Sequence, residues 1–167
     1  PDLNGKATAG WTPLCAALCE QNHEIARLLL QYDVEVNHTV TGQCLSPLHY
    51  ACYYGKNDIV KTLLEKGAEV NVKANDGQTP LFFAVAMSHT ECVDLLIYLG
   101  GDKTILDNRG KSVLNIAEKN GDKDIANILM DKGNHGKTMK ELLLKDVSDE
   151  DMHPVLRYQS NGKDHPT

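Results

Sequence analysis

Apolar residues along this chain recur in short blocks with helical spacing, and the blocks themselves repeat. Four segments align when Pro13, Pro47, Pro80 and Val113 are placed in register, at steps of 34, 33 and 33 residues. Each segment holds a short apolar block from this position and, after a turn, a second block with apolar residues three and four apart. A period this regular, carried through four copies, predicts four similar structural units.

Each unit predicts a pair of short helices. A hydroxyl residue stands where it can cap the first helix of every copy: Thr12, Ser46, Thr79 and Ser112. Proline follows in three copies, at the first helical position, where its missing N–H costs nothing. The second helices carry apolar residues at helical spacing, namely Ile25, Leu28 and Leu29, then Ile59, Val60, Leu63 and Leu64, then Val93, Leu95 and Leu96, and last Ile125, Ile128 and Leu129.

The end of each second helix and the packing of the pairs also follow from the pattern. A left-handed glycine is expected after three of the second helices, at Gly67, Gly100 and Gly133, with Asp33 in its place in the first copy. Small residues stand in register on the first helices, at Ala17, Ala51, Ala84 and Ala117, so neighbouring helices can approach closely. Two short helices cannot enclose their own apolar faces, so the units must stack.

The residues in register resemble the ankyrin repeat family. The resemblance is carried by Thr12-Pro13-Leu14, Ser46-Pro47-Leu48-His49-Tyr50-Ala51, Thr79-Pro80-Leu81, Gly67-Ala68-Glu69-Val70-Asn71 and the preceding Gly10, Gly77 and Gly110. It covers about residues 2–133 and implies an all-α solenoid of about four helix-turn-helix repeats, with β-hairpin-like fingers and a concave face of fingertips and first helices. The resemblance also implies a structural hydrogen bond for His49 at its helix start.

The domain organisation follows from the register. We expect a repeat array over residues 1–136, with repeats at about 10–42, 43–76, 77–109 and 110–133. Residues 1–9 resemble the tail of a preceding repeat, since Asp2-Leu3-Asn4 matches Glu35-Val36-Asn37. Polar Asn115, Glu118 and Lys119 give the fourth copy the character of a terminal repeat. A capping box at Thr138–Glu141 predicts one more helix over about 138–146, so residues 137–167 are expected to form this helix and a flexible tail.

Composition narrows the class of protein. Apolar content of 41% with 24% charged residues is ordinary for a soluble fold, and no run approaches the roughly 18 apolar residues that span a bilayer. The net charge of −6, without a basic stripe, argues against nucleic-acid binding. Five cysteines without a framework spacing indicate free thiols in a reducing compartment, so we expect a monomer in the cytoplasm or the nucleus.

Candidate chemistry is sparse. Gly110-Lys111-Ser112 and Gly136-Lys137-Thr138 lack the earlier glycine of a phosphate-binding loop, which is Ile105 or Asp131 here, so helix capping explains them better than a nucleotide does. Stacking could bring Cys15 near His49, but no paired Cys-x-x-Cys supports a zinc site, and a buried thiol is the common alternative. No nucleophile stands beside a base in the pattern, so we expect no cofactor, no metal and no intrinsic catalysis.

Asn37 and Asn71 carry a further resemblance. Each follows an acidic residue and Val, with Leu29 or Leu63 eight positions upstream, which is similar to the target pattern of the asparaginyl hydroxylase that modifies ankyrin repeats. The alternative is that each asparagine stabilises the backbone of its own turn. Both readings stay open at this point.

The resemblance also places a partner surface. It implies that the exposed positions are the fingertips and the last two residues of each first helix. The candidate residues are Trp11, Cys19, Glu20, Leu45, Tyr53, Tyr54, Asn75, Asp76, Gln78, Met87, Arg109 and Lys111, together with the neighbouring Ala86, Asn108, Lys119 and Asn120. Tyr and Trp are frequent interface anchors, so adjacent Tyr53 and Tyr54 stand out, although their rings could also lie flat against their own repeat.

Two functions remain from the sequence. The first is a non-enzymatic module that binds a protein or peptide in its concave groove. The alternative is a regulatory or targeting segment of a larger multidomain protein, such as an enzyme.

Overall fold

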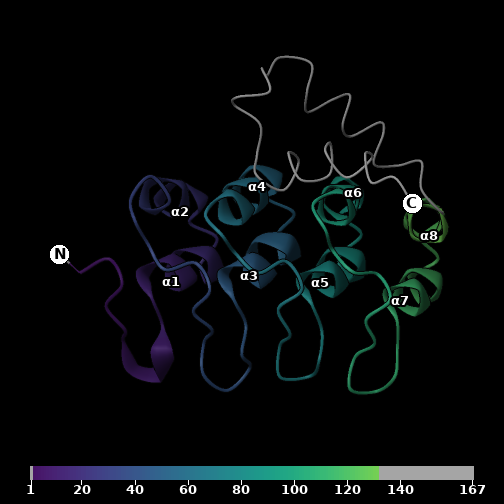
Figure 1. The fold of residues 1–167 in the computed structure, drawn as a ribbon, viewed down its shortest axis with the longest axis horizontal. Coiled ribbons are helices and arrows are strands. Elements are labelled where there is room, and N and C mark those ends of the chain that lie inside the picture. Colours follow the sequence, from purple (N-terminus) through teal and green to yellow (C-terminus); the bar gives the residue numbers. More distant parts are fainter. Residues whose placement is uncertain (1, 132–167) are drawn as a thin grey trace, which may run out of the picture.

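The computed structural model describes residues 2–131 and shows a stack of helix pairs (Figure 1). The first helices of the four pairs are α1 (Pro13–Cys19), α3 (Pro47–Tyr53), α5 (Pro80–Ala86) and α7 (Val113–Asn120). The second helices are α2 (His23–Leu29), α4 (Asn57–Glu65), α6 (Thr90–Tyr98) and α8 (Lys123–Met130). A short 3-10 helix, η1 (Thr8–Gly10), precedes them. One pair lies within each of the four repeats expected from the sequence.

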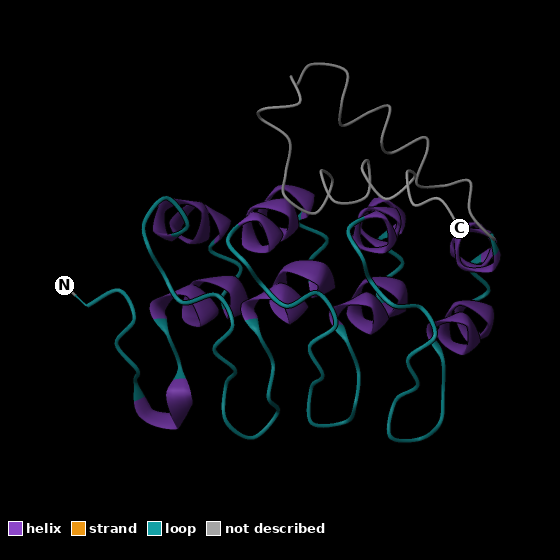
Figure 2. Cartoon of the chain, viewed as in Figure 1, coloured by secondary structure: helices purple, strands orange, loops and turns teal. Residues whose placement is uncertain are grey.

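The two rows of helices lie side by side, and the connecting fingers project from the row of first helices (Figure 2). Contacts run along the rows, from α1 to α3, α5 and α7, and from α4 to α6 and α8. Within residues 2–131 the fingers contain no regular strand, only an antiparallel bridge between Val40 and Leu45. The prediction of an all-α solenoid is confirmed. Gly133, the helix expected over 138–146 and the tail lie outside the described residues.

The core forms where the repeats meet. Leu48, Ala51 and Cys52 are fully buried on α3, as the pattern predicts, and Ala17, Ala84 and Ala117 are buried in register with Ala51. Gly67 and Gly100 have positive φ at the ends of the second helices, as expected. The alanines that stand in register on the first helices are therefore buried in every repeat.

The first repeat departs from this pattern at α2. Ile25 and Leu28 are about half exposed, whereas Ala26 and Leu30 are buried. The equivalents of Ile25 in the next two repeats, Ile59 and Cys92, have a repeat before them in the stack and are 1% exposed. Helical spacing locates an apolar face, but a neighbouring repeat has to cover it.

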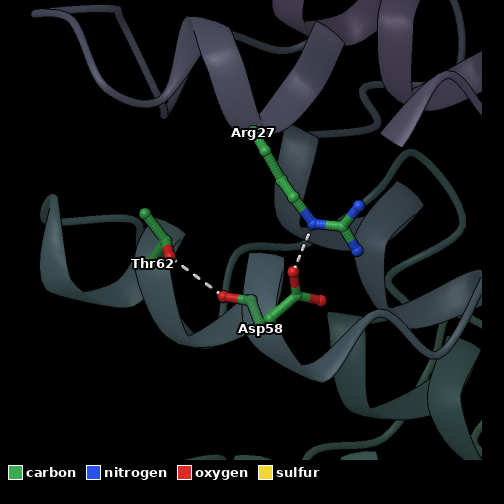
Figure 3. A network of polar contacts seen from close by, with 3 residues as sticks. All are labelled: Arg27, Asp58 and Thr62. Carbon is green, nitrogen blue, oxygen red and sulfur yellow. Dashed lines mark hydrogen bonds and ion pairs between the residues drawn. The ribbon is translucent and has the colours of Figure 1, made fainter. Parts of the chain in front are cut away.

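A polar contact joins α2 of the first repeat to α4 of the second (Figure 3). Arg27 Nε lies 2.5 Å from Asp58 Oδ2, and Thr62 Oγ1 donates to the Asp58 carbonyl at 2.9 Å. The hydrogen bond from Arg27 holds the pKa of Asp58 below its usual value. Because both side chains are about half exposed, solvent screens the pair and it adds little stability.

The predicted hydroxyl residue caps the first helix in the first, second and fourth repeats. In the third repeat, Thr79 makes no such cap. Thr12, Ser46 and Ser112 each accept a backbone N–H with the side-chain oxygen. Thr79 Oγ1 is buried and finds no hydrogen-bond partner within residues 2–131. The position three residues later differs too: it is His49 and Asn115 where the second and fourth repeats form a capping box, but Phe82 in the third.

We expect Thr79→Val to leave the free energy of unfolding unchanged or slightly raised, because it removes a buried hydroxyl that is not bonded. The matched change is Thr12→Val, which deletes a cap, because Thr12 Oγ1 accepts the Cys15 N–H at 3.2 Å. It should lower the free energy of unfolding by about 1 kcal/mol. Urea denaturation of both variants measures the difference. Equal losses would show that the Thr79 hydroxyl is bonded after all.

Candidate functional site

The last residues of the first helices reach the surface unevenly. Tyr53 is 40% exposed and Met87 is 42% exposed, whereas Tyr54 and Cys19 are half-buried. The Tyr53 ring meets Tyr54 edge-on, with centroids 5.0 Å apart, and lies 6.3 Å from the ring of Phe83 on the next repeat. Tyr53 and Met87 therefore offer apolar surface, as the sequence predicts for this row.

Tyr54 has a structural contact that the sequence does not indicate. Its hydroxyl donates to the Cys19 carbonyl at 3.2 Å, across the junction of the first two repeats. The equivalent carbonyls are bonded in the same way in the next two junctions. His89 Nε2 contacts the Tyr53 carbonyl at 2.9 Å, and Asn120 Nδ2 donates to the Ala86 carbonyl at 3.3 Å. Each of these three side chains satisfies a carbonyl at the end of the preceding first helix.

We expect Tyr54→Phe to lower the free energy of unfolding by about 1 kcal/mol, because it deletes one hydrogen bond and leaves the ring in place. Tyr53→Phe is the matched control, since the exposed Tyr53 ring keeps its contacts with Tyr54 and Phe83. Thermal or urea unfolding of the two variants makes the comparison. Equal stability of both variants would mean that the Tyr54 hydroxyl bond contributes nothing.

The fingertips are tied to one another by asparagine. Asn75 N donates to the Gln43 carbonyl at 2.9 Å and Asn75 Nδ2 to the Gly42 carbonyl at 3.0 Å. Asn108, on the fourth finger, makes the same two bonds to the third finger, to Asp76 O and Asn75 O. These two asparagines, expected as partner contacts, thus also hold neighbouring fingers together.

The remaining fingertip residues fall into two groups. Trp11 and Leu45 are half-buried, and the Trp11 ring lies 6.1 Å from that of Tyr50. Gln78 is half-buried as well, and its carbonyl contacts His49 Nε2. The exposed predicted fingertip residues are Asn75, Asp76, Arg109 and Lys111, and Glu20 at the end of α1 is exposed as well.

Asp107 organises the fourth finger, a role that the repeat pattern did not predict. Its Oδ1 accepts the backbone N–H groups of Arg109 and Lys111, both at 2.9 Å, and Gln78 Nε2 donates to Oδ2 at 3.4 Å. The Lys111 bond is the main reason why the pKa of Asp107 lies below its usual value. An acidic residue at the first position of the turn was the available signal, because Asp readily bonds the backbone two residues on.

A hollow of about 400 Å³ opens between the second and third fingers. Its lining includes Gly42, Gln43, Leu45, Asn75, Asp76 and Phe83. Three of these, Leu45, Asn75 and Asp76, belong to the predicted partner surface, and Phe83 does not. Phe83 could have been found, because it stands one repeat after the half-buried Tyr50 in register.

The predicted residues are therefore only partly brought together. Leu45 and Asp76 share the hollow, and the Tyr53 ring contacts Phe83 at its edge. Met87, the C-cap residue of α5, follows Phe83 by one helical turn. Arg109 and Lys111 are on the fourth finger and do not line the hollow. Trp11 and Cys19 belong to the first repeat and do not line it either.

Asn37 and Asn71 form a second ladder, at the base of the fingers. Asn37 Nδ2 donates to the Gly67 carbonyl at 2.9 Å, and its Oδ1 accepts from Glu69 N at 2.8 Å. Asn71 makes the same two bonds one repeat later, to Gly100 O and Asp102 N. These bonds give both asparagines a structural role between repeats rather than within their own turn. Their hydroxylation stays a prediction.

Other reactive groups have structural contacts. Cys15 is buried, with its Sγ 3.9 Å from the His38 carbonyl, and burial raises its pKa. Ser112 caps α7, as expected for the first Gly-Lys-hydroxyl triplet, whereas Gly136-Lys137-Thr138 lies outside the described residues. Within residues 2–131, no cluster of three or more His, Cys, Asp or Glu side chains could hold a metal ion. No helix in this part of the chain is long and apolar enough to cross a membrane.

Relatives in three organisms match parts of the chain. It is 34% identical over 77 residues to Ankyrin repeat-containing protein P1E11.10 of Schizosaccharomyces pombe, covering 46% of this chain and 36% of that protein. It is 37% identical over 109 residues to Ankyrin repeat and SOCS box protein 11 of Mus musculus, covering 64% and 32%. The third, Probable E3 ubiquitin-protein ligase XBOS33 of Oryza sativa subsp. japonica, is 39% identical over 98 residues, covering 58% and 19%.

The matched segment thus spans about a third of the length of the first two relatives and less of the third. A family model for ankyrin repeats, in three copies, matches residues 1–74 and 70–141. These matches extend over most of the chain and agree with the stacked helix pairs and projecting fingers. The chain belongs to the ankyrin repeat family.

Proposed function

We propose that this chain is a protein-interaction module that binds a protein or peptide in the concave face formed by the fingers and first helices. The observation that carries the proposal is the adjoining apolar surface of Tyr53, Phe83 and Met87 beside the hollow. Exposed aromatic and Met side chains that gather on one face are typical of interaction sites. Ankyrin repeats indicate the same class of function.

The binding would be non-enzymatic. The His49 side chain is buried, and both of its ring nitrogens are engaged in structural contacts. All five cysteines are free thiols, which suits a reducing compartment, so we place the interaction in the cytoplasm or the nucleus. A monomer would leave the whole concave face open to a partner.

The test is affinity capture with a surface variant. Tyr53→Ser/Met87→Ser removes two exposed apolar groups from the concave face, and capture of the specific partner should fall at least tenfold, as for interface hot spots. Tyr32→Ser is the matched control, because Tyr32 is 54% exposed but follows α2, in the row of second helices. Quantitative mass spectrometry compares the captured proteins, and melting temperatures verify that the variants are folded. Equal capture by wild type and the concave-face variant would contradict the proposal.

A second candidate function is suggested by the relatives. Their names include a SOCS box protein and a probable E3 ubiquitin-protein ligase, and the chain matches only a part of each. The alternative is therefore that this array selects or positions a partner for a larger multidomain protein. Measuring the mass of the endogenous protein, and sequencing its full transcript, would decide between the two. A product with no segment beyond this array would exclude the alternative.

A further inference from the structure

The hollow between the second and third fingers combines one charge with an aromatic wall. Within residues 2–131, Asp76 is the only charged residue that lines it, and Phe83 and Leu45 supply apolar surface. The remaining lining residues are uncharged: polar Gln43 and Asn75, with small Gly42 and Ala74. At about 400 Å³ the hollow is at the lower end of ligand sites, which hold roughly 300–1,000 Å³.

The Asp76 side chain is held in place. Its Oδ1 accepts the Gln78 N–H at 3.0 Å, and its carbonyl accepts the Asn108 N–H at 2.9 Å. The carboxylate is therefore held by its own finger, the backbone that carries it is held by the next finger, and Asp76 is exposed to solvent. A fixed, accessible carboxylate is suited to a charged hydrogen-bond donor.

The Phe83 ring is held as well. It meets the His49 ring edge-on at 5.0 Å and the Tyr53 ring at 6.3 Å. A ring packed on two sides keeps its orientation and costs little ordering when a ligand arrives. An aromatic face beside a carboxylate fits a planar cation better than a point charge, because guanidinium groups both stack on rings and pair with carboxylates.

We propose that the hollow binds an arginine side chain of an extended peptide, with the guanidinium on Asp76 and its flat face against Phe83. An apolar residue next to that arginine would lie over the adjoining Tyr53 and Met87. The net charge of −6 favours a basic peptide over an acidic one. This inference rests on the proposed concave-face function and names the chemistry of the partner.

The experiment selects a phage-displayed library of random peptides on the full chain and measures the enriched peptides, labelled with fluorescein, by anisotropy. Enriched sequences should share an arginine beside an apolar residue. Asp76→Asn keeps the acceptor for Gln78 and removes the charge, so it should weaken binding about tenfold. Phe83→Leu, which keeps an apolar group in the fold, should weaken binding about threefold.

Asp102→Asn is the matched control. Its carboxylate accepts the Thr104 N–H at 2.8 Å, as Asp76 accepts that of Gln78, but Asp102 does not line the hollow. Binding to this variant should equal that of wild type. Replacing the peptide arginine with glutamine should also abolish the difference between wild type and Asp76→Asn, which ties the charge on the protein to that on the peptide.

Two results would overturn the inference. One is a selection that yields no binders or yields peptides without arginine. The other is Asp76→Asn binding as tightly as Asp102→Asn. If a captured protein still depends on Tyr53 and Met87 while Asp76→Asn has no effect, the interaction function stands and only the arginine site fails.

Discussion

The free energy of unfolding should fall by about 3 kcal/mol between pH 6.5 and pH 4, and His49 is the reason. The ring is buried, and Nδ1 accepts the Ser46 N–H at 3.0 Å, so the proton sits on Nε2, which donates to the Gln78 carbonyl at 3.0 Å. Protonation would turn Nδ1 into a donor that faces another N–H. Burial disfavours the charged ring and lowers the pKa of His49 to about 4.

The sign and the pH range follow from proton uptake. The pKa of His49 in the unfolded chain is about 6.5, so between pH 6.5 and 4 the unfolded chain binds a proton that the folded chain does not. His49 therefore stabilises the fold fully above pH 6.5 and progressively less as the pH falls toward 4. Asp58 and Asp107, whose pKa values are lowered from 3.8, lose their contributions as the pH falls from about that ordinary value toward their lower folded values.

His49→Asn is the test that the fourth repeat offers. Asn115 occupies the same position there, and its Oδ1 accepts the Ser112 N–H at 2.9 Å without titrating. We expect His49→Asn to lower the free energy of unfolding by about 1 kcal/mol at pH 7, because the contact with the Gln78 carbonyl is lost. The variant should also show a much flatter pH dependence. His23, whose pKa is also lowered by burial, is present in both chains, so their difference isolates His49. Parallel pH profiles from urea denaturation would refute the role assigned to this ring.

The ladder at the finger bases should carry the second large effect. Asn71→Ala removes two hydrogen bonds to the next repeat, to Gly100 O and from Asp102 N, at 3.1 and 2.8 Å. At about 1 kcal/mol for each bond, we expect a loss of about 2 kcal/mol, and a similar loss for Asn37→Ala. The free energy of unfolding, from urea titration followed by circular dichroism, measures both.

Asn4 provides a graded control. Its Oδ1 accepts the Glu35 N–H at 2.7 Å, the acceptor half of the same pattern, so Asn4→Ala should cost about 1 kcal/mol. A loss at Asn71 no larger than that at Asn4 would contradict the two-bond account. The ladder also affects the predicted hydroxylation, because a modifying enzyme must reach a side chain whose amide is bonded on both sides. Modification of Asn37 or Asn71 would therefore require local opening of the repeat junction.

Local signals predicted the elements of the fold. Pro13, Pro47 and Pro80 start helices because their chemistry fits the first helical position whatever surrounds them. Cys52 and Ala51 are buried because helical spacing places them on the face of the stack, and the steps of 34 and 33 residues set the register of neighbouring repeats. The family resemblance rested on these same signals.

The site was less predictable because it depends on pairs that are distant in sequence. Tyr54 and Cys19 are 35 residues apart, and nothing near either residue shows that the hydroxyl meets that carbonyl. Tyr53 and Tyr54 looked equivalent as neighbours, yet one is exposed and the other bridges two repeats. Phe83 was missed because its neighbours on α5 are apolar as well, so only its register with Tyr50, and not the helix itself, could have indicated that it reaches the surface.

Left-handed backbone at the fingertips has a consequence for how this surface can evolve. Gly10, Gly77 and Gly110 hold this position with positive φ in three fingers, and Cys44 holds it in the second, with φ of 55°. A cysteine in that conformation costs about 1 kcal/mol or more, and Gly avoids the strain. The second finger, which forms one wall of the hollow, thus tolerates a side chain at a position where the array otherwise uses none. That position is a place where a reactive or bulky group can be introduced beside the hollow while the helices that support it stay unchanged.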